Sequence, residues 1–215
     1  MLYRIGKQIG ALAIDGFLFS TQFATYPLDW WMSRRIGLRV YVPNNFYVPR
    51  GTLVIANHRS LFDPFLVTYH LGSQNWLSVV PTRYPTKSSY ARRRMLGTII
   101  KALGAYDIGL TSIERAKKLL YTRTLLDRQH TVLLFPEGKI VDKGKLVEEF
   151  QQGAKILFAH DYPTVFVRLT GFNTDSFFHP DRAPDARMYY SEVIRGDTAT
   201  KAKRMEQFFS GAAPW

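Results

Sequence analysis

The sequence predicts an α/β fold in which helices cover both faces of a mixed, largely parallel sheet, an αβα arrangement preceded by an N-terminal helical segment. Three observations predict this fold. Short apolar runs alternate along the chain with longer segments of helical spacing, as in strand–helix units. The 215 residues are 46 % hydrophobic, so the chain can bury a substantial core although it has no cysteine for disulfides. The first 35 residues differ in composition from the rest and indicate a separate element.

Residues 1–36 are expected to form a helical anchor that lies on a membrane surface. An apolar stretch over residues 8–28 contains one charged residue, Asp15, and is followed by Trp30-Trp31 and Arg34-Arg35. A central Asp costs about 2.5–3.5 kcal/mol on membrane-insertion scales, and tryptophan favours the headgroup level. We therefore expect an interfacial helix rather than a spanning one. A helix that merely packs on the domain remains the alternative. A cleaved signal peptide is a further possibility, but no clear Ala-x-Ala cleavage site follows the apolar stretch.

The remaining residues, 37–215, are expected to form one domain of alternating strands and helices. Four apolar runs predict buried strands at Thr52–Ala56, Leu77–Val80, Val132–Phe135 and Val165–Leu169. Helical spacing predicts helices at Phe65–Leu71, Tyr90–Leu103, Ile113–Arg128, Leu146–His160 and Thr200–Phe209. No internal repeat or long linker divides this part of the chain.

The net charge of +12 is concentrated in the first half of the chain. Residues 1–106 contain 13 Lys and Arg but three acids, whereas residues 107–215 contain 16 and 14, and no acid lies between Asp63 and Asp107. Such an asymmetric field predicts an anionic partner: a nucleic acid, an anionic lipid surface or a phosphate-bearing substrate. The absence of zinc-finger spacing and of an RNP-type aromatic signature argues against nucleic acid.

The first chemical motif, residues 57–64 (NHRSLFDP), directly follows the predicted strand at Thr52–Ala56. Asp63 followed by Pro64 is a good helix start, with Asp63 as the N-cap. The turn between His58 and Asp63 is also long enough to bring the carboxylate back to the imidazole. A carboxylate on one ring nitrogen fixes the tautomer and raises the basicity of the other, which makes a competent general base. Both roles of Asp63 remain open.

The second motif, Phe135-Pro136-Glu137-Gly138-Lys139, directly follows the strand at Val132–Phe135. Pro136 ends the strand, and Gly138 can adopt backbone angles that let amide groups approach a ligand. Ends of strands are where α/β folds place their sites, so the two motifs are expected to lie close together.

Together these motifs resemble the glycerolipid (lysophospholipid) acyltransferase superfamily, of the 1-acyl-glycerol-3-phosphate acyltransferase type. Residues 57–63 match its His-x-x-x-x-Asp block and residues 135–138 its Phe-Pro-Glu-Gly block, within a resemblance over roughly residues 38–195. The resemblance implies an αβα fold with a membrane-associating helix and transfer of a fatty acyl group from a thioester of coenzyme A or acyl carrier protein to a hydroxyl of a lysophospholipid or glycerol-phosphate-type acceptor. It implies a peripheral protein on the cytoplasmic face, bound to anionic phospholipid and active in phospholipid biosynthesis or remodelling.

On this resemblance His58 is the general base and Asp63 orients it. The residues expected to contact substrates are Asn57, Phe135, Pro136, Glu137, Gly138, Lys139 and Arg168. Glu137 is expected either to fix acceptor hydroxyls or to shape its turn, and amides around Gly138 are candidate donors to the developing oxyanion. No cysteine or Gly-x-Ser-x-Gly elbow offers an acyl-enzyme nucleophile, so transfer is expected to be direct. No cofactor or metal is expected, because the other histidines form no ligand motif.

Three stretches depart from the family pattern on the acceptor side. Gly104–Leu110 lacks the acid and arginine of the family's Gly-x-x-x-x-Asp-Arg block, for which Arg115 is a possible substitute. Lys139 and Ile140 replace the usual Thr or Ser and Arg, and Val165–Arg168 lacks the usual proline. Two alternatives follow: an acyltransferase with a non-glycerophosphate acceptor, and a non-catalytic relative that binds anionic lipid.

Overall fold

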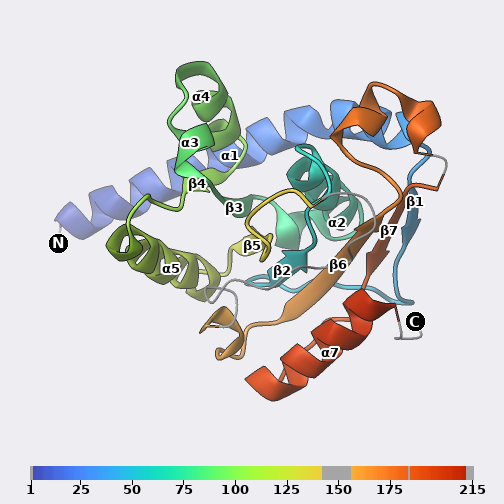
Figure 1. The fold of residues 1–215 in the computed structure, drawn as a ribbon. Helices are drawn as coiled ribbons and strands as arrows, with labels where there is room; N and C mark the ends of the chain where they lie inside the picture. Colours follow the sequence, from blue (N-terminus) through green and yellow to red (C-terminus); the bar gives the residue numbers. More distant parts are fainter. Residues whose placement is uncertain (1, 142–155, 184, 212–215) are drawn as a thin grey trace.

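A seven-stranded sheet forms the centre of the protein in a computed structural model that describes residues 2–141, 156–183 and 185–211 (Figure 1). The strand order is β1-β7-β6-β2-β5-β3-β4. The strands are β1 (Arg39–Tyr41), β2 (Leu53–Ala56), β3 (Thr82–Thr86), β4 (Ala105–Asp107), β5 (Thr131–Leu134), β6 (Thr164–Thr170) and β7 (Arg187–Tyr190). Neighbouring strands run parallel except β6 and β7, which are antiparallel. The prediction of a mixed, largely parallel sheet is confirmed.

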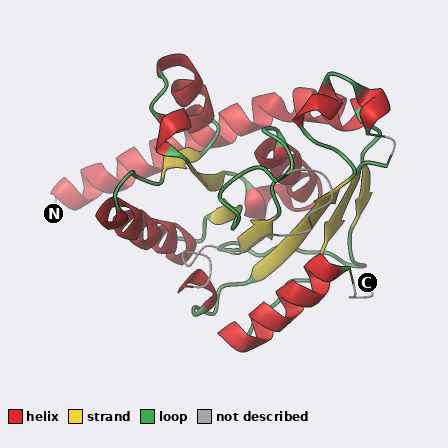
Figure 2. Ribbon diagram, viewed as in Figure 1, coloured by secondary structure: helices red, strands yellow, loops and turns green. Residues whose placement is uncertain are grey.

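Helices cover both faces of this sheet (Figure 2). They are α1 (Leu2–Arg35), α2 (Asp63–Val79), α3 (Ser88–Ala91), α4 (Arg94–Ala102), α5 (Ser112–Asp127) and α7 (Thr198–Ser210), with the short 3-10 helices η1 (Thr174–Phe177) and η2 (Pro180–Arg182). On one face, Met32 of α1 and Leu66 of α2 join the core cluster that contains Val54. On the other face, Leu125 of α5 and Phe208 of α7 pack in the cluster that contains Ile55 and Phe166. The αβα layering is therefore observed.

Several predicted elements differ from those observed. The strand predicted at Leu77–Val80 is wrong, because α2 continues through a kink at Asn75 to Val79, and a short apolar run does not distinguish a strand from a buried helix. The helix predicted at Tyr90–Leu103 is broken into α3 and α4. The helix predicted over residues 146–160 lies mostly outside the described residues. Of its described part, residues 156–160, the first three are helical.

The polar residues of α1 dock this helix onto the domain. The Gln22 amide donates to the carbonyl oxygens of Thr82 (2.7 Å) and Leu103 (3.0 Å) and accepts from the Thr82 N–H (2.9 Å). Asp15 Oδ2 lies 3.7 Å from His130 Nε2. Asp15 and Gln22, two of the polar interruptions of the apolar stretch, therefore contact the domain. No helix in the described part of the chain has a stretch that is both long and apolar enough to traverse a bilayer. Contact of α1 with a membrane surface stays a prediction.

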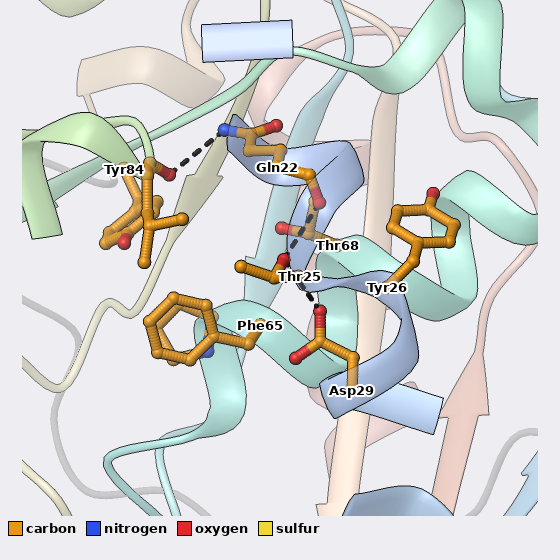
Figure 3. A pocket seen from close by; sticks show the side chains of 9 residues that line it. Gln22, Thr25, Tyr26, Asp29, Phe65, Thr68 and Tyr84 are labelled. Atoms are coloured by element: carbon orange, nitrogen blue, oxygen red, sulfur yellow. Dashed lines mark hydrogen bonds between the residues drawn. The ribbon is translucent and has the colours of Figure 1, made fainter. Parts of the chain in front are cut away.

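Asp29 is buried at the junction of α1 and α2, beside a small cavity (Figure 3). Thr25 and Asp29 of α1 face Phe65 and Thr68 of α2, and Asp29 Oδ2 accepts a hydrogen bond from Thr25 Oγ1 (3.1 Å). Burial raises the pKa of Asp29 to about 7, although the Thr25 hydrogen bond acts against this rise. The protonated form is thus favoured in the folded state.

Asp29→Asn is expected to stabilise the protein at pH 8 and to have little effect near pH 4. The folded-state pKa of Asp29 lies above the unfolded-state value, so its contribution to stability is present below pH about 4 and is lost as pH rises to about 7. Asparagine still accepts from Thr25 and cannot ionise, so at pH 8 the gain should be about 1–4 kcal/mol. Denaturant unfolding between pH 4 and pH 8 measures it. Asp181→Asn, which changes an exposed carboxylate, is the control. Equal pH profiles for wild type and Asp29→Asn would contradict the assignment.

Candidate functional site

The loops after β2 and β5 meet at the carboxyl ends of these adjacent parallel strands. The register pairs Leu53 with Val132, so both strands end at the same edge of the sheet. The His58 N–H donates to Glu137 Oε2 (2.9 Å), and the Val141 N–H donates to the His58 carbonyl oxygen (2.9 Å). The structure therefore brings the two sequence motifs together, and hydrogen bonds from His58 to Glu137 and from Val141 to His58 join their loops.

His58 and Asp63 form a hydrogen-bonded pair in the loop after β2. The distance from His58 Nδ1 to Asp63 Oδ2 is 2.9 Å, and the Asp63 side chain is fully buried while 18 % of the His58 side chain is exposed. The imidazole stacks on Phe135, with ring centroids 4.2 Å apart. An ionised carboxylate can only accept, so Nδ1 carries the proton and Nε2 carries the lone pair. Nε2 has no hydrogen-bond partner among the described residues.

The Asp63 carboxylate faces back into its loop. Oδ2 also accepts from the N–H groups of Arg59 (2.6 Å) and Ser60 (2.7 Å), and Oδ1 accepts from Ser60 Oγ (2.5 Å). Asp63 is itself the first residue of α2, and no described amide of α2 donates to its carboxylate. The N-cap prediction is therefore wrong: all four donors precede Asp63 in the chain. Asp63 instead orders the loop and orients the imidazole.

Ser60, Arg59 and Thr174 support this loop and were not predicted. Ser60 is fully buried, and its Oγ accepts from the Phe62 N–H (3.1 Å) while donating to Asp63. Arg59 is buried, with Nη1 3.4 Å from the Val141 carbonyl oxygen. Thr174 of η1 accepts from the Leu61 N–H (3.1 Å). Ser60 and Arg59 could have been found from their place inside the first motif, whereas nothing in the sequence links Thr174 to it.

One carboxylate oxygen of Glu137 joins the two loops, and the other is buried. Oε2 accepts from the His58 N–H, whereas Oε1 is buried and has no hydrogen-bond partner among the described residues. Burial raises the pKa of Glu137, and the His58 amide together with the nearby Arg59 and His58 side chains limits that rise. Glu137 therefore shapes the junction of the two loops and also retains an acceptor.

The rest of the second motif forms the turn that carries Glu137. Gly138 has a φ of +62°, which favours glycine, and its N–H donates to the Phe135 carbonyl oxygen (3.1 Å). This amide is thus used within the turn, and the expectation that amides around Gly138 donate to an oxyanion stays a prediction. Pro136 is buried, and Lys139 is exposed directly after the turn.

Asn57 and Arg168 have different surroundings from the His58–Asp63 pair. The Asn57 amide donates to the Leu169 carbonyl oxygen (2.9 Å) and accepts from the Leu169 N–H (2.7 Å), so it joins the end of β2 to β6. Arg168 Nη1 donates to the Phe208 carbonyl oxygen of α7 (3.2 Å), and its guanidinium lies 4.7 Å from the centroid of the Tyr189 ring. Phe135 packs on the α2 side of the sheet and Phe208 on the opposite side. The structure therefore does not bring Arg168 to His58.

The end of β4, where the family pattern is altered, is organised by Asp107. Burial acts to raise the pKa of Asp107, but hydrogen bonds from Ser88, Gly109 and Arg92 together lower it to about 2. Arg92 Nε lies 3.1 Å from Asp107 Oδ2. Arg115, the possible substitute for the family arginine, is an exposed residue of α5. In the described part of the chain, no cluster of three or more His, Asp or Glu could hold a metal ion.

Comparisons with known proteins find an acyltransferase family model and a solved structure of similar fold. A family model described as Acyltransferase matches residues 37–167, more than half of the chain. The solved structure of PlsC, a 1-acyl-sn-glycerophosphate (LPA) acyltransferase from Thermotoga maritima, has a similar fold with a TM-score of 0.58. That similarity covers 97 % of this chain and 94 % of PlsC at 17 % sequence identity. A comparison with curated proteins gives no match.

Proposed function

The chain belongs to the acyltransferase family, as the two motifs indicated, and on that premise we propose that it moves a fatty acyl group from an acyl thioester to a hydroxyl of a lysophospholipid or glycerol-phosphate-type acceptor. The observation that carries the proposal is the His58–Asp63 pair, whose Nδ1–Oδ2 hydrogen bond leaves Nε2 as the basic nitrogen. An alcohol is a poor nucleophile at neutral pH and needs such a base.

In the proposed reaction His58 Nε2 takes the proton of the acceptor hydroxyl as its oxygen attacks the thioester carbonyl. The tetrahedral intermediate collapses when the carbon–sulfur bond breaks, and the departing thiolate receives the proton from the imidazolium. Asp63 stabilises the imidazolium and holds its orientation. Ser60 is the serine nearest to His58 in the sequence, but its Oγ is hydrogen-bonded to Asp63 and the residue is fully buried. This supports direct transfer without an acyl-serine.

Two other residues of the second motif are proposed to contact substrates. Glu137 Oε1 is a buried acceptor next to His58, suited to a hydrogen bond from a second hydroxyl of the acceptor. Lys139 is exposed beside the same turn and is suited to a phosphate of the donor or of the acceptor. Coenzyme A and acyl carrier protein both supply such a donor thioester with a phosphate.

We also propose that the protein is a peripheral protein of an anionic membrane, on its cytoplasmic face. The outward side of α1 exposes large apolar side chains, namely Leu12, Ile14, Phe17, Phe23, Leu28, Trp30 and Trp31. Arg34 lies over the Trp30 ring and Arg35 over the Trp31 ring, with 5.1 and 5.3 Å to the centroids. Aromatic and basic residues at one end of an apolar helix face suit the headgroup region.

An acyl-transfer assay with a panel of acceptors tests the proposed chemistry. Purified protein and an acyl-coenzyme A are offered 1-acyl-glycerol-3-phosphate, glycerol-3-phosphate, lysophospholipids with other headgroups, and polar alcohols. We expect an acylated product from at least one phosphate-bearing acceptor. Acylation of polar alcohols alone would support the non-glycerophosphate alternative. Binding of phosphatidate vesicles with no acylated product from any acceptor would contradict the proposed reaction and indicate a non-catalytic relative.

A further inference from the structure

Helix α4 exposes an apolar face that nothing in the described protein covers. Met95, Leu96 and Ile99, here called the α4 patch, are 78 %, 38 % and 50 % exposed. Residues four apart share one side of a helix, so Met95 and Ile99 point the same way. Gly97 is buried and Ile100 packs against the core, so the helix is held by its other side. The patch is therefore the outer side of a fixed amphipathic helix.

Basic side chains lie next to the α4 patch in the sequence, at both ends of α4. Arg93, Arg94 and Lys101 are exposed and have no carboxylate partner in the part of the chain that the structure describes. Arg93 lies over the ring of Tyr90, which is itself partly exposed. The chain has no acid between Asp63 and Asp107, and Asp107 is engaged with Arg92. The surroundings of the patch are thus cationic and contain no neutralising acid within this stretch of sequence.

An exposed apolar patch on a helix with basic residues at both ends fits an anionic lipid surface better than the other occupants. Apolar side chains enter the boundary between headgroups and acyl chains, while Lys and Arg attract anionic headgroups. A second copy of the chain docked on the same helix would bring the basic residues of both copies together, which is repulsive. Nucleic acid would be attracted by the charge but would not use exposed Met and Ile side chains.

The α4 patch is fixed relative to α1. Thr21 Oγ1 donates to the Ala102 carbonyl oxygen (2.5 Å), and the Gln22 amide donates to Leu103, so the C-terminal end of α4 is hydrogen-bonded to the middle of α1. Figure 1 shows α3 and α4 projecting from the body of the protein beside α1. A surface that engaged both elements would fix the orientation of the domain, whereas α1 alone would leave rotation about its own axis.

We propose that α3–α4 is a second membrane-docking element, in which the α4 patch inserts below the headgroups and Arg93, Arg94 and Lys101 bind lipid phosphates. This inference rests on the membrane location proposed above. Membrane docking would give a function to the stretch between Asp63 and Asp107, whose basic charge alone does not distinguish between anionic partners.

Flotation of the full chain with vesicles tests this proposal. The vesicles contain equal amounts of phosphatidylcholine and phosphatidylglycerol, and the test variant carries Met95→Ser and Ile99→Ser. We expect its vesicle affinity to fall about 10- to 100-fold, because two apolar side chains no longer enter the bilayer. The matched control carries Ile113→Ser and Leu120→Ser on α5, where the side chains are 70 % and 63 % exposed, and should bind like wild type. Thermal melts establish that both variants are folded.

A second variant separates charge from apolar insertion. Arg93→Gln with Arg94→Gln should weaken binding about 30-fold at low salt and reduce its salt dependence, since each basic residue near an anionic surface contributes about 1 kcal/mol to binding. Undiminished binding by both test variants would overturn the role of α4 while leaving the membrane location intact. Absence of vesicle binding by the wild type would overturn both the role of α4 and the membrane location. The acyl-transfer assay with the acceptor panel would then still test the proposed reaction separately. A wild-type dimer that Met95→Ser with Ile99→Ser dissociates would also overturn the proposal.

Discussion

His58→Ala is expected to lower the rate of acyl transfer by about 10²–10⁴-fold with little change in the affinity for the acyl donor. The substitution removes Nε2, the basic nitrogen of the pair, whereas proton abstraction matters only in the transition state. The stability loss should be small because the imidazole is partly exposed, and Asp63 keeps its hydrogen bonds to the Arg59 and Ser60 amides. Steady-state rates and donor titrations measure both quantities.

The chain offers a matched control for this substitution. His179 also faces a carboxylate, with Nε2 3.8 Å from Asp175 Oδ1, but this pair is exposed. His179→Ala should therefore retain near-normal turnover. A fully active His58→Ala in a thiol-release assay would be incompatible with the proposed base.

Replacing Asp63 should separate its role in ordering the loop from its role in orienting the imidazole. In Asp63→Asn the amide oxygen can take the place of Oδ2, and the amide nitrogen can donate to Ser60 Oγ, so the loop is expected to keep its fold. The neutral side chain no longer supports an imidazolium, and turnover should fall by about 10²–10⁴-fold. Near-normal turnover of a folded Asp63→Asn would contradict the orienting role.

Asp63→Ala should also destabilise the protein, by about 2–5 kcal/mol. It leaves the Arg59 and Ser60 amides and Ser60 Oγ buried without their acceptor, and an unsatisfied buried donor costs about 1–3 kcal/mol. Ser60→Ala, which removes one of these donors and keeps the carboxylate on His58, is the control. It should lose about 1 kcal/mol and retain most of the activity. Denaturant unfolding measures the free energy of unfolding of the wild type, Asp63→Ala and Ser60→Ala.

The centre of the sheet could be predicted from the sequence because β2, β5 and β6 are buried on both faces and therefore read as continuous apolar runs. The strands β1 and β4 were missed because they have three residues each, and β3 and β7 because polar residues interrupt them. The run at Leu77–Val80 was misread because α2 resumes after Asn75.

The candidate site could be predicted in its two loops but not in their detailed contacts. The His58–Asp63 pair and the proximity of Glu137 follow from motifs at the ends of neighbouring strands. The direction of the Asp63 carboxylate could not be foreseen, because its donors depend on the path of the loop. Arg168 has the right sequence position at a strand end, but the alternation of side chains along β6 directs it to the α7 side. The polar residues in α1 were interpreted as interruptions of a membrane-associating segment. In the structure Thr21 and Gln22 instead form hydrogen bonds with the domain.

The His58–Asp63 pair is proposed to transfer the acyl group directly to an acceptor hydroxyl. The most direct measurement is a quenched reaction of the protein with acyl-coenzyme A and 1-acyl-glycerol-3-phosphate, in which released thiol, acylated lipid and the intact mass of the protein are determined together. Direct transfer predicts one released thiol for each acylated lipid, thiol release that requires the acceptor, and a protein mass without an added acyl group. Thiol release that needs no acceptor, or a protein that gains the mass of the acyl chain, would contradict it.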